Sequence, residues 1–176
     1  PYRRQRQMCI RDRTVWFEKD TLKAPFMASR ASCSVPLITK IQHYMGYDLL
    51  DGGISDPIPI EKSLADGNTF HVIVLTRNKG YQKEPFGHTA FLKAAFRKYP
   101  AVAEAMRTRH EIYNRQLALC EKLEKAGRAV IIRPLKPLNV SRTKAEVPAL
   151  LALHDEGLYE GRTALGSIEE MLSIKL

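Results

Sequence analysis

The stretch YDLLDGGISDPIPI, residues 47–60, carries the most information about the fold of this 176-residue chain. A short apolar run leads to Asp51, which is followed by two glycines, Gly52 and Gly53, and then by a Ser-Asp-Pro turn. Adjacent glycines after an acid indicate either a backbone conformation closed to other residues or the close approach of another group. Taken alone, the pattern is typical of a strand that ends in a glycine-rich turn, with the acid making local hydrogen bonds.

Apolar and β-branched runs outside this stretch predict further strands, at Thr14–Phe17, Phe70–Thr76 and Ala129–Arg133. The run at 70–76 is almost continuously apolar, which predicts a central strand buried on both faces, as in a parallel sheet. Helices are expected at His88–Tyr99 and from Pro100 onward, with Gly127 as the C-cap of the second helix. The strand–helix–strand succession predicts an α/β fold with a mainly parallel sheet and a helix-rich C-terminal part.

The C-terminal region has its own helix signals. Thr143 and Glu146 form a predicted capping box that opens a helix through Leu153. Gly157 is expected to interrupt this helix, and residues 163–174 are expected to form a separate last helix.

The net charge of +9 is concentrated at one end of the chain. Residues 1–13 contain five arginines and one aspartate, a net charge of +4, which leaves +5 for all the rest. Their string MCIRDR resembles translated sequencing-adapter DNA, and no apolar segment of a signal peptide follows the arginines. We therefore interpret residues 1–13 as a non-native basic tail, leave them out of the fold prediction, and keep a genuine basic arm as the alternative.

The three cysteines, Cys9, Cys33 and Cys120, are far apart and form no C-x-x-C pair. This spacing predicts free thiols in a reducing compartment, so a cytoplasmic location is expected, with Cys33 as a buried thiol. His110 has no second ligand one helical turn away, and the histidines show no spacing typical of a metal site or of a Ser-His-Asp triad. The sequence implies no metal and no cofactor. No apolar run is long enough to cross a bilayer.

Several motifs occur together in one order: ASRASCSVPLI (28–38), DGGISDPIP (51–59), VIVLTRNKGY (72–81), FRKYP (96–100) and RHEIYN (109–114). In this order they resemble the patatin-like phospholipase family, in particular its bacterial members, over nearly all of the chain from residue 14. The resemblance implies a three-layer α/β/α fold and a Ser-Asp catalytic dyad. It also implies that Asp51 is the base of that dyad, with Gly52 and Gly53 supporting the motif.

The resembling family presents its serine on a G-x-S-x-G elbow, and this chain contains no such motif. Gly53, Ile54 and Ser55 begin the pattern, but Asp56 and Pro57 break it. We therefore interpret residues 14–87 as the C-terminal part of a patatin-like catalytic domain and residues 88–176 as a region that completes or flanks it. The full-length protein is expected to be a lipid acyl hydrolase, and this fragment is expected to be inactive. Asp56 is expected to cap the following helix.

Two other functions fit the sequence. One is a pseudoenzyme that keeps the fold without the serine. The other is a non-catalytic basic module that binds nucleic acid or an anionic membrane. The basic residues of the helix after Pro100 could touch anionic lipid, but aromatic residues do not interleave with them as nucleic-acid stacking requires. The expected partners are therefore a lipid or other acyl-ester substrate and, transiently, an anionic membrane surface, and no nucleic acid.

Overall fold

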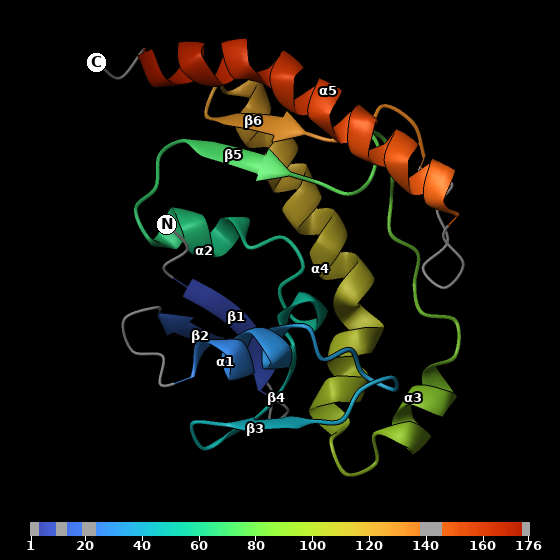
Figure 1. Cartoon of the computed structure of the whole chain (residues 1–176). Helices are drawn as coiled ribbons and strands as arrows, with labels where there is room; N and C mark the ends of the chain where they lie inside the picture. The colour runs from blue at the N-terminus through green and yellow to red at the C-terminus, as the bar shows by residue number, and fades with distance from the viewer. Residues whose placement is uncertain (1–3, 10–13, 19–23, 138–145, 174–176) are drawn as a thin grey trace. The chain divides into compact units, whose positions relative to one another are not determined.

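A computed structural model describes residues 4–9, 14–18, 24–137 and 146–173, and for residues 4–9 it describes the backbone alone. Helices and strands are mixed along the chain, as Figure 1 shows. The elements are β1 (Arg4–Cys9), β2 (Thr14–Glu18), α1 (Pro25–Ser32), β3 (Gln42–Tyr44), β4 (Tyr47–Asp51), the 3-10 helix η2 (Gly52–Ile54), α2 (Ile60–Ala65), β5 (His71–Val74), α3 (Thr89–Ala95), α4 (Pro100–Lys125), β6 (Ala129–Ile132) and α5 (Val147–Ser173). The expected strands at 14–17, 70–76 and 129–133 are thus confirmed as β2, β5 and β6.

The chain divides into two compact units, and each is assembled from two separate stretches of sequence. Unit 1 contains residues 1–59 and 83–116, and unit 2 contains residues 60–82 and 117–176. The boundary expected at residue 87 refers to the resembling family, and it stays a prediction.

Unit 1 contains a four-stranded antiparallel sheet with the order β2-β1-β4-β3. A two-residue turn joins β3 to β4, and both of its residues have positive φ, +48° at Met45 and +77° at Gly46. Such turns match the right-handed twist of the strands that they connect. The expectation of a mainly parallel sheet is therefore wrong for the described strands, because three of their four pairings are antiparallel.

Strand β1 lies in the segment that the sequence analysis set aside. It pairs with β2 on one side and with β4 on the other, so its backbone fills the gap between these two strands. Residues 4–9, which the fold prediction left out, therefore form a strand. Strand pairing satisfies backbone N–H and C=O groups and does not require an apolar period in the sequence. Whether this segment is native stays a prediction.

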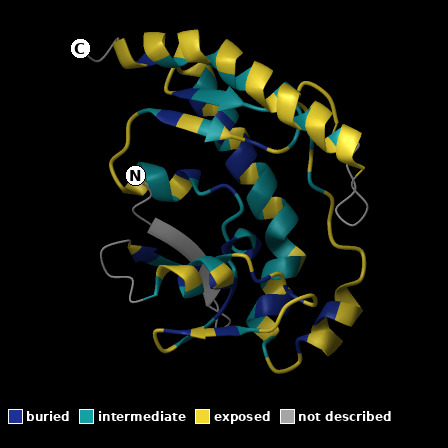
Figure 2. Cartoon of the chain, in the orientation of Figure 1, coloured by how far each residue is buried: buried dark blue, intermediate teal, exposed yellow. Residues whose placement is uncertain are grey.

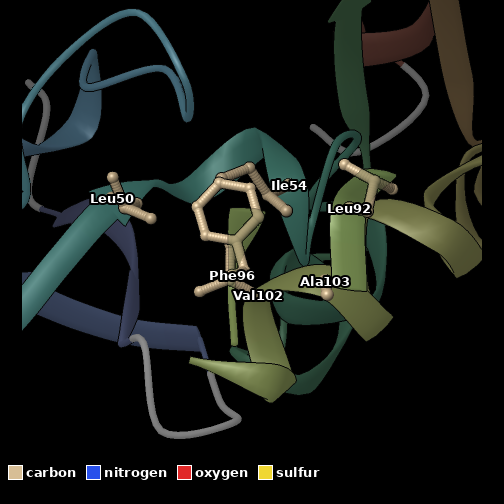
Figure 3. Close-up of a cluster of buried hydrophobic side chains, with 6 residues drawn as sticks. All are labelled: Leu50, Ile54, Leu92, Phe96, Val102 and Ala103. Carbon is tan, nitrogen blue, oxygen red and sulfur yellow. The ribbon is translucent and has the colours of Figure 1, made fainter. Parts of the chain in front are cut away.

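The two faces of β4 are buried against different helices. Leu49 is fully buried with Phe17, Tyr44 and two alanines of α1. Leu50, the next residue, points to the opposite face, as successive residues of a strand do. Figure 3 shows Leu50 in the cluster that the helices α3 and α4 complete, with Ile54, Leu92, Phe96, Val102 and Ala103. Unit 1 therefore has helices on both sides of β4, and Asp51 is the last residue of this strand.

Unit 2 contains the parallel pair β5 and β6. The parallel α/β expectation is confirmed for this pair. However, Val72 and Val74 of β5 are 50% and 70% exposed, so the expected burial of this strand on both faces is wrong. The pair has only two strands in the described chain, and α5 packs on β6.

Helix α4 ends as its sequence predicts. Gly127 has a φ of +67°, its N–H donates to Glu124 O, and the next N–H donates to Leu123 O. This pair of hydrogen bonds is the Schellman motif that a C-terminal glycine favours.

Helix α5 is longer than predicted. It runs without a break from Val147 to Ser173 through Gly157, so the expected interruption is wrong. A glycine within a helix costs only about 1 kcal/mol relative to alanine, which packing along 27 residues outweighs. Thr143 of the expected capping box lies outside the described residues.

Candidate functional site

Asp51 lies at the carboxyl end of β4, where the strand passes into η2. Its Oδ1 accepts a hydrogen bond of 2.7 Å from the backbone N–H of Gly53 and so caps η2. Its own N–H donates to Ser34 O, 2.8 Å away, in the loop after α1. The side chain is half-buried, and none of the described residues is hydrogen-bonded to its Oδ2. Asp51 is thus a fixed carboxylate with one oxygen used locally.

Gly52 and Gly53 do not adopt the unusual backbone angles that a pair of adjacent glycines suggests. Gly52 is buried and Gly53 is half-buried, but neither is among the described residues with positive φ. The 3-10 helix therefore does not need glycine for its backbone angles. The Gly53 carbonyl accepts a hydrogen bond of 2.7 Å from Arg109 Nε of α4. The D-G-G stretch is thus tied to β4 at one end and to α4 at the other.

Gln116 of α4 holds the residues after η2 and is a site residue that the sequence analysis missed. Its side chain is 2% exposed. Its Nε2 donates to Asp56 Oδ1 at 2.7 Å, and its Oε1 accepts from the N–H of Ile58 at 2.8 Å. The sequence could have indicated this role, because Gln116 lies in register with the apolar face of a long helix and a buried amide must find hydrogen-bond partners.

Asp56 was expected to cap the next helix, and this expectation is wrong. Helix α2 begins at Ile60, four residues further along, which is too far for an N-cap contact. Instead the Asp56 carboxylate is bound by Gln116. Asp56 therefore has a structural contact within unit 1, and Asp51 remains the carboxylate at the strand end.

The loop that begins at Ser34, whose carbonyl binds the Asp51 N–H, carries exposed apolar side chains. Val35, Leu37 and Ile38, in the loop that begins at Ser34, are 42%, 51% and 82% exposed. Leu37 has a φ of +69°, a region that few residues other than glycine adopt. Backbone strain of this kind is found preferentially at functional sites.

The serines near Asp51 make other contacts. Ser34 Oγ donates to Arg30 O, and Ser55 Oγ is 2.8 Å from Thr14 Oγ1. Neither hydroxyl is hydrogen-bonded to the Asp51 carboxylate. Asp51 is therefore a candidate base to which no serine hydroxyl is hydrogen-bonded within residues 14–18, 24–137 and 146–173.

His71 is a buried histidine at the start of β5, in unit 2. Its Nδ1 lies 3.1 Å from Ser63 Oγ, while its Nε2 is buried with no partner among the described residues. Burial, and secondarily the positive charge of Arg128, lowers the pKa of His71 below its usual value of 6.5. His71 therefore begins β5 with one of its two ring nitrogens within hydrogen-bonding distance of a hydroxyl.

The two described cysteines differ in exposure. Cys33 is exposed, so the expectation of a buried thiol is wrong there, because the residue caps the C-terminal end of α1 at the protein surface. Cys120 is fully buried in α4, and burial raises its pKa to about 11. Within the described ranges, no group of three histidine, cysteine or acidic side chains gathers as metal ligands would.

A groove of about 390 Å³ lies between α3 and α4 in unit 1. Lys93, Arg97 and Arg107 line it together with Phe96 and Glu104. Arg107 donates two hydrogen bonds to Glu104, at 2.9 and 2.6 Å, and this contact lowers the pKa of Glu104. The groove therefore combines an apolar floor with a net positive lining.

A family described as "Domain of unknown function (DUF6363)" matches residues 99–173, which include α4 and α5 but not the D-G-G stretch. No curated protein matches the chain. Among the helices that the structure describes, none combines the length and the apolarity that a bilayer crossing requires.

Proposed function

We propose that this chain is part of a patatin-like lipid acyl hydrolase in which Asp51 is the base of a Ser-Asp dyad. The observation that carries the proposal is the position of Asp51: a carboxylate fixed at the carboxyl end of a strand that has helices on both faces. A fixed carboxylate there can accept the proton of a serine hydroxyl as that hydroxyl attacks an ester.

The surroundings of Asp51 support a lipid substrate. The exposed side chains of Val35, Leu37 and Ile38 offer an apolar surface for an acyl chain, in the loop whose first residue, Ser34, binds the Asp51 N–H. The Gly53 N–H uses one carboxylate oxygen and holds the side chain in place, while Oδ2 stays available to a hydroxyl. The serine itself would come from sequence outside this chain. In the finer fold that we propose, the described sheets are parts of the larger α/β/α domain.

The test uses the longer protein, once the sequence upstream of residue 14 has been recovered. We expect it to hydrolyse short-chain nitrophenyl esters and lysophospholipids, and we expect Asp51→Asn to lower kcat by about 10³-fold, because the base is lost. Asp56→Asn is the matched control: it removes the carboxylate five residues further along the chain but keeps the oxygen that Gln116 binds. That variant should stay within about twofold of the unaltered protein.

Each outcome bears on a different part of the proposal. Turnover that survives Asp51→Asn would remove Asp51 from the mechanism. The 176-residue chain alone should be inactive; activity of this chain that Asp51→Asn abolishes would show that it contains its own nucleophile. An upstream sequence without a G-x-S-x-G serine would favour the pseudoenzyme.

The alternative function is a basic module that binds an anionic lipid surface. The groove lined by Lys93, Arg97 and Arg107 favours it, because three cations outnumber the single carboxylate of Glu104. This alternative would be favoured over the hydrolase if the longer protein hydrolysed no ester and bound anionic vesicles in a salt-sensitive way.

A further inference from the structure

Helix α5 has two apolar stripes, and only one of them is packed. On the first stripe Leu153, Ala164 and Met171 are half-buried or buried, and α5 packs on β6. The second stripe contains four leucines at intervals of seven residues: Leu151, Leu158, Leu165 and Leu172. Their side chains are 60%, 46%, 53% and 52% exposed. Figure 2 shows the side of α5 away from β6 as largely exposed.

The second stripe has the spacing of a coiled-coil seam. If the four leucines occupy position a of a heptad, position d is occupied by Val147, His154, Gly161 and Ile168. A strict interval of seven residues keeps one seam facing a second α-helix when the two helices supercoil around each other. The seam covers residues 147–172, a length of about 38 Å at 1.5 Å per residue. The shape of the stripe therefore indicates a helical partner.

The charges of α5 argue against a lipid surface as its partner. Helices that lie on membranes carry lysine and arginine on their polar face. Between Val147 and Ser173 there is one basic residue, Arg162, against five acidic ones, Asp155, Glu156, Glu160, Glu169 and Glu170. Anionic head groups would repel this helix.

We propose that the leucine seam of α5 binds the same seam of a second copy of this chain, in antiparallel orientation. Antiparallel pairing places each position a opposite a position d of the other copy. Leu158 then fits over the second copy's Gly161, and Leu165 lies against the second copy's His154. A large side chain thus meets a small or polar one in the two central layers, so that the two helices approach closely.

The flanking charges select this orientation. On the exposed side of the seam, position e is occupied by Pro148, Asp155, Arg162 and Glu169. In the antiparallel register Asp155 of each copy lies near Arg162 of the other, which gives two equivalent ion pairs about a two-fold axis. In a parallel pair, position e would face position g, where Leu150, Gly157, Ala164 and Met171 carry no charge. Self-complementary charge therefore favours a second copy over an unrelated helix.

The first experiment measures the oligomeric state of the 176-residue chain by sedimentation equilibrium. We expect a dimer at about 100 µM, and Leu158→Glu with Leu165→Glu should raise its Kd at least tenfold. Phe91→Glu is the matched control, since Phe91 is an equally exposed apolar residue on α3 (55%), and it should leave the Kd unchanged. Circular dichroism of each variant checks that the helices remain folded.

The second experiment tests orientation and partner. Asp155→Arg and Arg162→Asp should each raise the Kd by about tenfold, since each turns two attractive pairs into repulsive ones, and the double variant should restore it. A chain that stays monomeric up to about 500 µM would overturn the proposal. A dimer that the leucine variants leave intact would also overturn it, as would charge reversals that the double variant does not rescue. Monomers that bind phosphatidylcholine vesicles through these leucines would overturn it in favour of a lipid surface.

Discussion

Single side chains of this protein combine a structural contact with a chemical possibility. Asp51 caps the 3-10 helix through one oxygen, as an aspartate in a tight turn commonly does. The same contact fixes the direction of the carboxylate and so prepares it to act on a neighbouring hydroxyl. The turn interpretation and the catalytic interpretation of Asp51 are therefore compatible, and the Asp51→Asn and Asp56→Asn pair separates them.

His71 sets a pH dependence at the residue scale. Its pKa is lowered in the folded state, so the unfolded chain binds the proton more readily when the pH falls below 6.5. We expect the free energy of unfolding to decrease from about pH 7.5 to about pH 5, as urea denaturation measures it. His71→Asn keeps an oxygen for Ser63 and should flatten this dependence. His154→Asn, which changes an exposed histidine, should leave it as steep as before.

At the scale of the element, the same residue type has opposite effects in different places. Gly127 adopts a left-handed conformation that ends α4, whereas Gly157, Gly161 and Gly166 lie within α5. From sequence alone, each of these glycines would be expected to interrupt a helix. Only the glycine whose φ is positive does so, because the others have the helical angles that any residue can adopt.

This difference predicts opposite changes in stability. Gly127→Ala should lower the free energy of unfolding by about 1 kcal/mol, since its Cβ meets no neighbour and the cost is that of the left-handed backbone. Gly166→Ala, on the exposed face of α5, should raise it by about 1 kcal/mol through helix propensity. Urea denaturation of both variants provides the comparison, and equal signs would contradict the explanation.

At the scale of the whole molecule, distant parts of the sequence meet within each unit. In unit 1 the loop after η2 is held by a residue of α4 that lies 60 positions away along the chain. In unit 2, β5 and β6 pair in parallel although two helices separate them in the sequence. Such contacts join segments that are distant along the sequence, and in unit 1 they hold the loop that follows Asp51 and η2.

Gln116→Leu tests this kind of contact. Leucine has a similar size but cannot bind the Asp56 carboxylate or the Ile58 N–H, so we expect the free energy of unfolding to fall by about 2 kcal/mol. Gln82→Leu, at an exposed position, is the control and should change it by less than about 0.5 kcal/mol. Equal effects of the two variants would show that the Gln116 contacts do not stabilise the loop.

The sequence by itself determined the strands at 14–18, 71–74 and 129–132, the start and end of α4, and Asp51 as the acid at a strand end. These features depend on local patterns: apolar runs, a proline at a first turn, a glycine past a last one. Only the tertiary structure decided the antiparallel order of the first sheet, the exposure of β5, the continuity of α5 and the roles of Gln116 and Arg109. The physical reason is that strand pairing, burial and buried hydrogen bonds depend on which distant segment lies opposite, and no local pattern contains that information.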